Sequence, residues 1–223
     1  MSDERTTTAW LSDHAKLSKD AQQAVAGVTD AGAALSALLD AHFPVEALRF
    51  LAYALPPREA IWWAWAAATH AARLTGEDAT PPAVSDALAA AERWIGSPDD
   101  ESRRAAWAAS EGAGLDSPSG CACAAAFFAS GSLAPPEIAP VPPPPGMHSM
   151  MVANAVTLAA LASPEHLQAM AAGYVTQGLE VLKQVGGWDH SVALSRAHLD
   201  AQREQHLKAT APAAPAPAPS SAS

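Results

Sequence analysis

Histidine offers the widest chemistry in this chain, because imidazole can transfer protons near neutral pH and can bind metal ions. The chain has eight histidines: His14, His42, His70, His148, His166, His190, His198 and His206. The last three are eight residues apart, whereas two histidines that chelate one ion from the same helix stand three or four residues apart. We therefore expect the last three to form a solvent-exposed stripe, and we predict no metal site.

His70 differs from the other histidines because it lies in an apolar segment, where we expect it to be buried. A single buried imidazole usually forms one hydrogen bond inside the core, which is the structural interpretation. The alternative is a catalytic or ligand-binding residue, in a site shared with Arg58 and Glu59 of the same segment. That alternative would make the protein an enzyme or a small-ligand-binding protein.

Arg58 and Glu59 stand at the start of a predicted helix, in the sequence LPPREAIWWA. A carboxylate is favourable in the first turn of a helix, but a cation there opposes the helix dipole. Arg58 therefore needs a partner, either the ring of Trp62 or an acid on another helix, such as Glu46 or Glu92. Structural anchoring is one interpretation. The other places Arg58 and Glu59 at the edge of a pocket that receives a carboxylate or the backbone of a partner protein.

The remaining pairs with suggestive spacing have structural interpretations. Arg103 stands four residues before Trp107, which gives a second possible arginine–tryptophan pair. Cys121 and Cys123 would diverge on a helix, so we interpret them as small apolar residues and not as a disulfide or a metal site. The sequence contains no glycine-rich phosphate loop and no HExxH or GxSxG motif. We therefore predict no catalytic residue, no cofactor and no enzymatic activity.

The composition restricts the kinds of partner that the chain can bind. It has 223 residues, and 13 basic against 23 acidic side chains give a net charge of −10. This acid excess argues against nucleic acid, because phosphate backbones are bound by basic surfaces. No apolar run reaches the about 18 residues that suggest a membrane-spanning helix. The first residues are polar and carry no apolar signal segment, so we expect a cytoplasmic protein.

The candidate residues named above must be positioned by helices, because apolar residues recur every three or four positions along the chain and no strand pattern occurs. From this periodicity we predict an all-α single bundle of about eight to ten helices. Four of them should begin at a hydroxyl residue followed by proline, which can cap the first turn: Thr80, Ser97, Ser117 and Ser163. The predicted helices cover residues 30–42, 45–55, 58–74, 81–95, 98–113, 118–129, 148–162, 164–185 and 189–208, and a weaker pattern covers 17–26.

The helix at residues 58–74 should be the central helix of this bundle. Between residues 60 and 68 it contains only alanine, isoleucine and tryptophan, including Trp62, Trp63 and Trp65. A helix that is apolar on every side is expected to be surrounded on every side. The chain also has 56 alanines, which would let neighbouring helices approach these rings closely.

We expect one helical domain over residues 17–208, between a flexible N-terminus at 1–16 and a disordered Ala/Pro/Ser tail at 209–223. Inside the domain, residues 135–146 contain seven prolines and cannot be helical. We interpret them as a stiff crossover between two helical halves, with a docking strap for an aromatic groove on a partner as the alternative. The region 105–182 around this strap has no Lys or Arg, so it is either core or a weakly polar contact surface.

The LPPREAIWWA sequence also carries a resemblance to known proteins. Together with Arg93-Trp94, Arg103-Arg104 and the GSLAPP sequence before the strap, it resembles a family of uncharacterised bacterial helical proteins with a Leu-Pro-x-Arg-Glu-Ala-x-Trp-Trp-Ala signature. The resemblance covers roughly residues 20–185. Members are often encoded near type VI secretion genes, and the family offers no catalytic residues. The resemblance therefore implies an accessory protein of a secretion system.

The function that these observations favour is a non-enzymatic protein-interaction module, acting as an accessory or adaptor protein of a type VI secretion system. It would dock a secretion component or effector on a preformed helical surface. The candidate contact residues are Arg58, Glu59, Trp62, Trp63, His70, Arg103 and Trp107. A further alternative is an immunity protein for a secreted toxin, since an acidic surface suits a basic toxin.

Overall fold

The structure, a computed structural model, describes residues 6–76 and 80–210, and over these residues its regular structure is all helical. The predicted all-α fold is therefore confirmed there. The described residues form eleven α-helices and one short 3-10 helix. The α-helices are α1 Thr7–His14, α2 Lys19–Ala24, α3 Ala31–Asp40, α4 Pro44–Ala54, α5 Pro57–Thr75, α6 Pro82–Gly96, α7 Asp100–Ala113, α8 Pro118–Phe128, α9 Met147–Ala160, α10 Leu167–Val185 and α11 Trp188–Thr210; the 3-10 helix, η2, is Pro164–His166.

Only one of the four predicted hydroxyl–proline starts caps its helix as expected. The hydroxyl of Ser117 accepts a hydrogen bond from the Gly120 amide at 3.0 Å. The other three starts are those at Thr80, Ser97 and Ser163. There the hydroxyl group donates a hydrogen bond to another acceptor and does not cap the helix. The start of α7 is capped instead by Asp99, which accepts from the Ser102 amide at 2.8 Å. Asp is as favourable as Ser at the N-cap position. Because Asp99 and not Ser97 is the N-cap, α7 begins two residues later than predicted.

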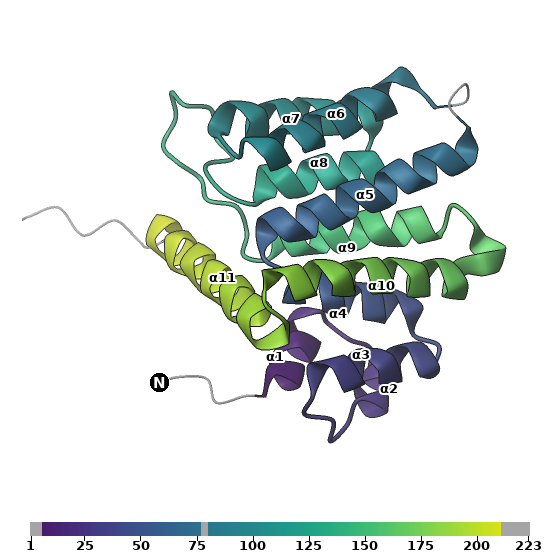
Figure 1. Ribbon diagram of the computed structural model, residues 1–223. Coiled ribbons are helices and arrows are strands. Elements are labelled where there is room, and N and C mark those ends of the chain that lie inside the picture. Colours follow the sequence, from purple (N-terminus) through teal and green to yellow (C-terminus); the bar gives the residue numbers. More distant parts are fainter. Residues whose placement is uncertain (1–5, 77–79, 211–223) are drawn as a thin grey trace, which may run out of the picture.

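The helices form layers around α8 and α9, which lie in the middle of the molecule (Figure 1). The residues of α8 from Ser119 to Phe127 are all buried, and α8 and α9 contact each other more extensively than any other pair of described helices. Small side chains allow this, because α8 is mostly alanine, glycine, serine and cysteine. No helix of the described chain is long and apolar enough to cross a membrane.

The arrangement of α5 differs from the expectation that it would be surrounded on every side. Its inner side is buried, including Ile61, Trp63 and Ala64. Its outer side is open, since Trp62 is 38% exposed and Trp65 is only partly buried. The helices that pack on α5 are α6, α8, α9 and α10, and together they leave one side of it uncovered.

The N-terminus also differs from the expected flexible segment at residues 1–16. From Thr7 it forms α1, because Trp10 and Leu11 bury their side chains in the core. Residues 1–5 lie outside the described residues. The predicted tail at 209–223 lies outside them from residue 211 onward, and its first two residues complete α11.

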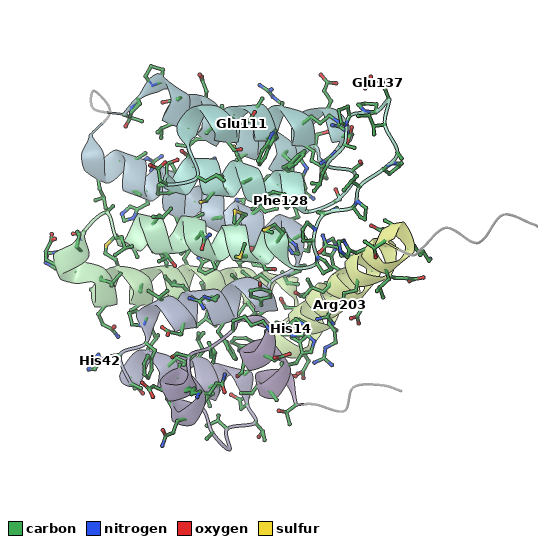
Figure 2. All side chains as sticks on the ribbon, turned by 180° about the vertical axis from the view of Figure 1, so that it is seen from behind. His14, His42, Glu111, Phe128, Glu137 and Arg203 are labelled. Carbon is green, nitrogen blue, oxygen red and sulfur yellow. The ribbon has the colours of Figure 1, made fainter. Side chains whose placement is uncertain are left out.

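The last helix, α11, lies diagonally across one end of the layers (Figure 1) and connects α1 with the proline-rich strap. Figure 2 shows Arg203 of α11 close to His14 of α1, where the guanidinium group donates to His14 Nε2. Further along α11, Gln202 accepts from the Gly146 amide at 3.1 Å and donates to the Phe128 carbonyl at 3.2 Å. Hydrogen bonds therefore contribute much of the contact between α11 and the rest of the molecule.

The strap at residues 135–146 runs over the outside of the bundle from α8 to α9, and Glu137 lies at its outer end in Figure 2. Its base is closed by the Leu133 amide, which donates to the Val141 carbonyl at 2.8 Å. The two helices that it joins pack on each other, so the strap is a surface crossover within one bundle. The charge-poor region 105–182 is therefore divided, with α8 and α9 in the core and the strap and outer side of α10 exposed.

Candidate functional site

The outer sides of α5 and α10 form one face of the molecule, turned toward the viewer in Figure 1. We call it the α5–α10 face. The helices run antiparallel, because the first residues of α5 lie beside the last turns of α10. The outward positions of α5, from Arg58 to Arg73, recur every three or four residues and so follow one side of the helix. Two grooves lie along this face, one near each end of α5.

The first groove has a volume of about 220 Å³ and contains three of the predicted residues, Arg58, Glu59 and Trp62. Arg58 Nε donates to the carbonyl of Ile95 at 2.7 Å, near the end of α6. A cation is favourable there, because the last carbonyls of a helix lack partners within it. This carbonyl takes the place of the two partners expected for Arg58, which were the ring of Trp62 and an acid on another helix.

Trp63 points the other way, into the core, where it is fully buried. Its indole Nε1 donates to the carbonyl of Tyr174 in α10 at 2.9 Å. Gly178, one turn later, leaves room for the ring, since a Cβ atom there would lie 3.0 Å from Trp63 and 2.6 Å from Leu51. Trp63 therefore holds α10 against α5 and is not available as a contact residue for a partner.

The second groove has a volume of about 520 Å³ and contains His70. We call it the His70 groove; its lining is Trp65, Ala66, Thr69, His70, Arg73, Ala169, Met170, Gly173, Tyr174 and Gln177. His70 is exposed and not buried as predicted, because it stands on the outer side of α5. Its Nδ1 lies 2.9 Å from the hydroxyl oxygen of Tyr174. Burial raises the pKa of Tyr174 to about 12, so this hydroxyl stays protonated at neutral pH.

The structure does not bring His70 together with Arg58 and Glu59, as the enzyme or ligand-binding alternative requires. All three are on α5, but His70 follows Glu59 by eleven residues, about 17 Å along a helix. They line different grooves. A single small ligand would therefore contact either His70 or the Arg58–Glu59 pair.

Arg103 and Trp107 lie outside both grooves, where α7 meets the chain that leads into the strap. Arg103 is 1% exposed and donates to the Asp100 carboxylate at 2.6 Å and to the carbonyls of Phe127 at 3.1 Å and Ser132 at 2.9 Å. Its guanidinium carbon lies 4.7 Å from the centre of the Phe127 ring, so it covers this ring in place of Trp107, the partner that its spacing made possible. Trp107 packs on Phe127 as well, at 4.8 Å between ring centres. Both residues have structural contacts.

The histidines that the structure buries are not the one predicted. His148 is fully buried, and the ring of His198 meets it edge to face at 4.9 Å. Burial lowers the pKa of His14, of His198 and of His148, the last to about 3. The expected solvent-exposed stripe is therefore wrong for His198 and His206, which are partly buried, although His190 is exposed. Among the described residues, no three His, Cys, Asp or Glu side chains are grouped so that they could hold a metal ion.

Sequence reasoning missed several residues of the His70 groove, chiefly Trp65, Arg73, Tyr174 and Gln177. Arg73 follows His70 by three residues, so the helical spacing within α5 could have indicated it. The residues of α10 carry no such indication. They reach the groove only because α10 packs beside α5, and local periodicity does not tell which helices become neighbours.

A comparison with protein families identifies the family of the region that contains both grooves. The model of a family of unknown function, DUF6931, matches residues 34–182, which run from α3 to α10 and include the whole of α5 and the His70 groove. Neither a curated protein nor a solved structure gives a significant match to the chain. Because the family model covers more than half of its residues, the chain belongs to DUF6931, a family of unknown function.

Proposed function

We propose that this protein is a non-enzymatic protein-interaction module that serves as an accessory or adaptor protein of a type VI secretion system. The observation that carries the proposal is Trp62, which is 38% exposed beside the first groove of the α5–α10 face. Tryptophan and arginine are enriched among the residues that dominate binding energy at protein interfaces. Trp62 lies between Arg58 and Arg73 on the same side of α5. This face therefore has the residue types of a binding surface.

The α5–α10 face is also held rigidly, which favours binding. Trp63 bonds α5 to α10, and Arg58 bonds it to the end of α6. Trp65 adds a third bond, because its Nε1 donates to the Leu88 carbonyl of α6 at 3.1 Å. A surface that is ordered before binding loses less conformational freedom when a partner docks. The mechanism that we propose is docking of a partner on this preformed surface, without a chemical step.

The assignment to type VI secretion rests on the resemblance of the LPPREAIWWA sequence to proteins encoded near secretion genes. That sequence forms the start of α5, and it supplies Arg58, Glu59 and Trp62 to the first groove. The residues of the signature and the residues of the proposed surface therefore coincide in part. On this proposal the partner is a component or an effector of the secretion machine.

Co-purification tests the proposal. The tagged full chain is isolated from cells that carry the neighbouring secretion genes, and the bound proteins are identified by mass spectrometry. We expect a secretion component or effector with the unchanged chain, and about tenfold less of it with Trp62→Ala. Leu207→Ala is the matched control, because Leu207 is a large apolar side chain on α11 that is 69% exposed. Recovery of no secretion component, or equal recovery with Trp62→Ala, would overturn the proposal.

A further inference from the structure

We infer, on the basis of the proposed function, that the His70 groove is the place where this protein recognises a carboxylate in its partner. The partner segment would present one Asp or Glu side chain to Arg73 and His70. Apolar side chains next to that carboxylate would cover Trp65 and Met170. The partner is thus a protein segment that combines an acidic residue with apolar neighbours.

Arg73 supplies the charge for this recognition. Its side chain is exposed in the last turn of α5, and it forms no ion pair or hydrogen bond with any described residue. Among the residues that the structure describes, no Asp or Glu lines the groove. In a chain with a net charge of −10, such a site is a local exception to the acidic composition. A guanidinium group binds a carboxylate through two parallel hydrogen bonds, so a carboxylate is the complementary group.

His70 and Tyr174 supply a second donor beside Arg73. The Tyr174 hydroxyl and His70 Nδ1 are 2.9 Å apart, and His70 Nε2 has no partner among the described residues. The hydroxyl has two acceptors within reach, and His70 Nδ1 at 2.9 Å is closer than the Ala67 carbonyl at 3.5 Å. When the hydroxyl donates to Nδ1, the hydrogen of the neutral ring is on Nε2, which can then donate to a ligand oxygen. The pair thus orients the imidazole and leaves its outer nitrogen available for the carboxylate.

The rest of the groove suits the parts of a peptide that flank a carboxylate. Trp65 and Met170 offer partly exposed apolar surface from α5 and α10. A Cβ atom added at Gly173 would meet nothing within 4 Å, so the groove is bare at that position. Gln177 has no hydrogen-bond partner among the described residues and can both donate to and accept from a peptide backbone.

The length of the α5–α10 face favours a protein segment over a small free acid. The face continues from Arg73 past Trp62 to Arg58, and these two arginines are about 22 Å apart along the helix. A small acid would fill only the His70 groove. A segment of a partner that occupies both grooves would also cover the exposed ring of Trp62 between their arginines. The continuous surface therefore matches an extended or helical segment.

Peptide display provides the test, because it selects ligands from random sequences and so works before the partner is identified. A library of random dodecapeptides is selected on the immobilised full-length chain, and the dissociation constant of enriched peptides is measured by fluorescence polarisation. We expect enrichment of peptides that have an acidic residue beside apolar ones. Arg73→Gln should weaken their binding about fivefold to tenfold. Gly173→Leu should weaken it more, because the new side chain fills the groove. The fold should be kept, since leucine suits a helix better than glycine.

Arg93→Gln is the matched control for Arg73→Gln. Arg93 is also an exposed arginine in the last turn of a helix, α6, and it has no ion pair with a described residue. We expect it to bind the selected peptides as the unchanged chain does. Circular dichroism and a thermal melt of each variant check that the fold is kept.

Three results would overturn the inference: selected peptides without acidic enrichment, equal binding to Arg73→Gln, or equal losses for the Arg73 and Arg93 variants. A failure of the proposed function would give a different combination of results. If no secretion component co-purifies but acidic peptides are selected and depend on Arg73, the groove inference stands and the secretion assignment fails. If a secretion component co-purifies while the peptides show no acidic preference, the opposite holds.

Discussion

Arg103 places a positive charge in the interior and satisfies it with acceptors from three separate parts of the chain. Asp100 provides the charge partner from the previous turn of α7, and the carbonyls of Phe127 and Ser132 come from the end of α8 and the turn after it. Hydrogen bonds from Arg103 and Arg104 hold the pKa of the Asp100 carboxyl below its usual range. A buried arginine is tolerated only with such partners, and here they attach the base of the strap to α7.

Replacing Arg103 should therefore cost much more stability than replacing its neighbour. We expect Arg103→Met to lower the free energy of unfolding by about 3 kcal/mol, because the buried carbonyl of Phe127 and the partly buried carbonyl of Ser132 lose their donor. Arg104→Met is the control. It shares Asp100 as a partner and donates to the Ala134 carbonyl at 2.9 Å, but its side chain is 31% exposed, so water can replace these bonds and we expect a loss below about 1 kcal/mol. Urea unfolding of both variants measures the difference, and equal losses would contradict the role of the buried carbonyls.

The two cysteines give a second prediction for single residues. Both are buried and free, and burial raises the pKa of Cys121 to about 11 and that of Cys123 to about 12. Because only the thiolate reacts readily, native protein should be labelled by Ellman's reagent far more slowly than a free thiol is. Unfolding in urea should release two reactive thiols per chain. Fast labelling of the native protein would show that α8 is more accessible than the structure indicates.

Sequence reasoning succeeds for residues whose roles depend on local spacing and fails for those whose partners come from elsewhere. The divergence of Cys121 and Cys123 followed from helical geometry alone. The partners of Arg103 are backbone carbonyls, which every residue has, so no pattern of residue types could indicate them. The burial predicted for His70 is wrong for a related reason. An apolar segment with three tryptophans does not reveal which of its sides the neighbouring helices will leave open.

At the scale of helices, the contact between α5 and α10 depends on one small residue. Gly178 of α10 packs against Leu51 and Trp63, where a Cβ atom would come within 2.6 Å and 3.0 Å of them. The leucine side chain can rotate, but the Trp63 ring is fixed by its hydrogen bond to Tyr174. A larger residue at position 178 would therefore push the two helices apart and disturb the α5–α10 face.

We expect Gly178→Ala to destabilise the protein by about 1–2 kcal/mol, because overpacking outweighs the better helix propensity of alanine. Gly173→Ala is the control in the same helix, where an added Cβ atom meets open space. That change should leave stability equal or raise it by up to about 1 kcal/mol. Thermal denaturation compares the two variants. A gain in stability at both positions would mean that the close approach at Gly178 is not maintained in solution.

Most helices could be predicted to within one or two residues, because their starts and ends depend on nearby residues such as the proline at the start of α8 or the glycine after α10. The first helix could not. Its apolar residues, chiefly Trp10 and Leu11, are too few to form a helical stripe. They are buried only because α1 packs on α3 and α4. Tertiary contact determines that helix.

At the scale of the whole molecule, α11 closes one end of the bundle through histidines. His198 of α11 meets the buried His148 of α9, and Arg203 of α11 bonds to His14 of α1. Burial lowers the pKa of all three histidines from the usual 6.5. The folded chain thus holds these imidazoles neutral at a pH where the unfolded chain would already bind protons. Stability must therefore decrease on acidification.

The pKa values of His148 in the unfolded and the folded chain determine the direction of this change in stability and the pH range over which it occurs. Below pH 6.5 the unfolded chain gains a proton that the folded chain excludes until its own pKa of about 3. The contribution of His148 to stability is therefore complete above pH 6.5 and decreases as the pH falls, with a loss of about 2 kcal/mol at pH 5. We expect urea unfolding to show a lower free energy of unfolding at pH 5 than at pH 7.

Two variants assign this pH dependence to the buried histidine. His148→Gln can keep the hydrogen bond to Ser149 that Nε2 forms at 3.1 Å, but it cannot be protonated. Its stability at pH 7 will be lower through imperfect packing, yet the difference between pH 7 and pH 5 should shrink by about 2 kcal/mol. His190→Gln, which changes an exposed histidine of α11, should leave the difference unchanged. If both variants keep the full pH dependence, other groups cause it, and the neutral state of His148 does not hold α9 and α11 together.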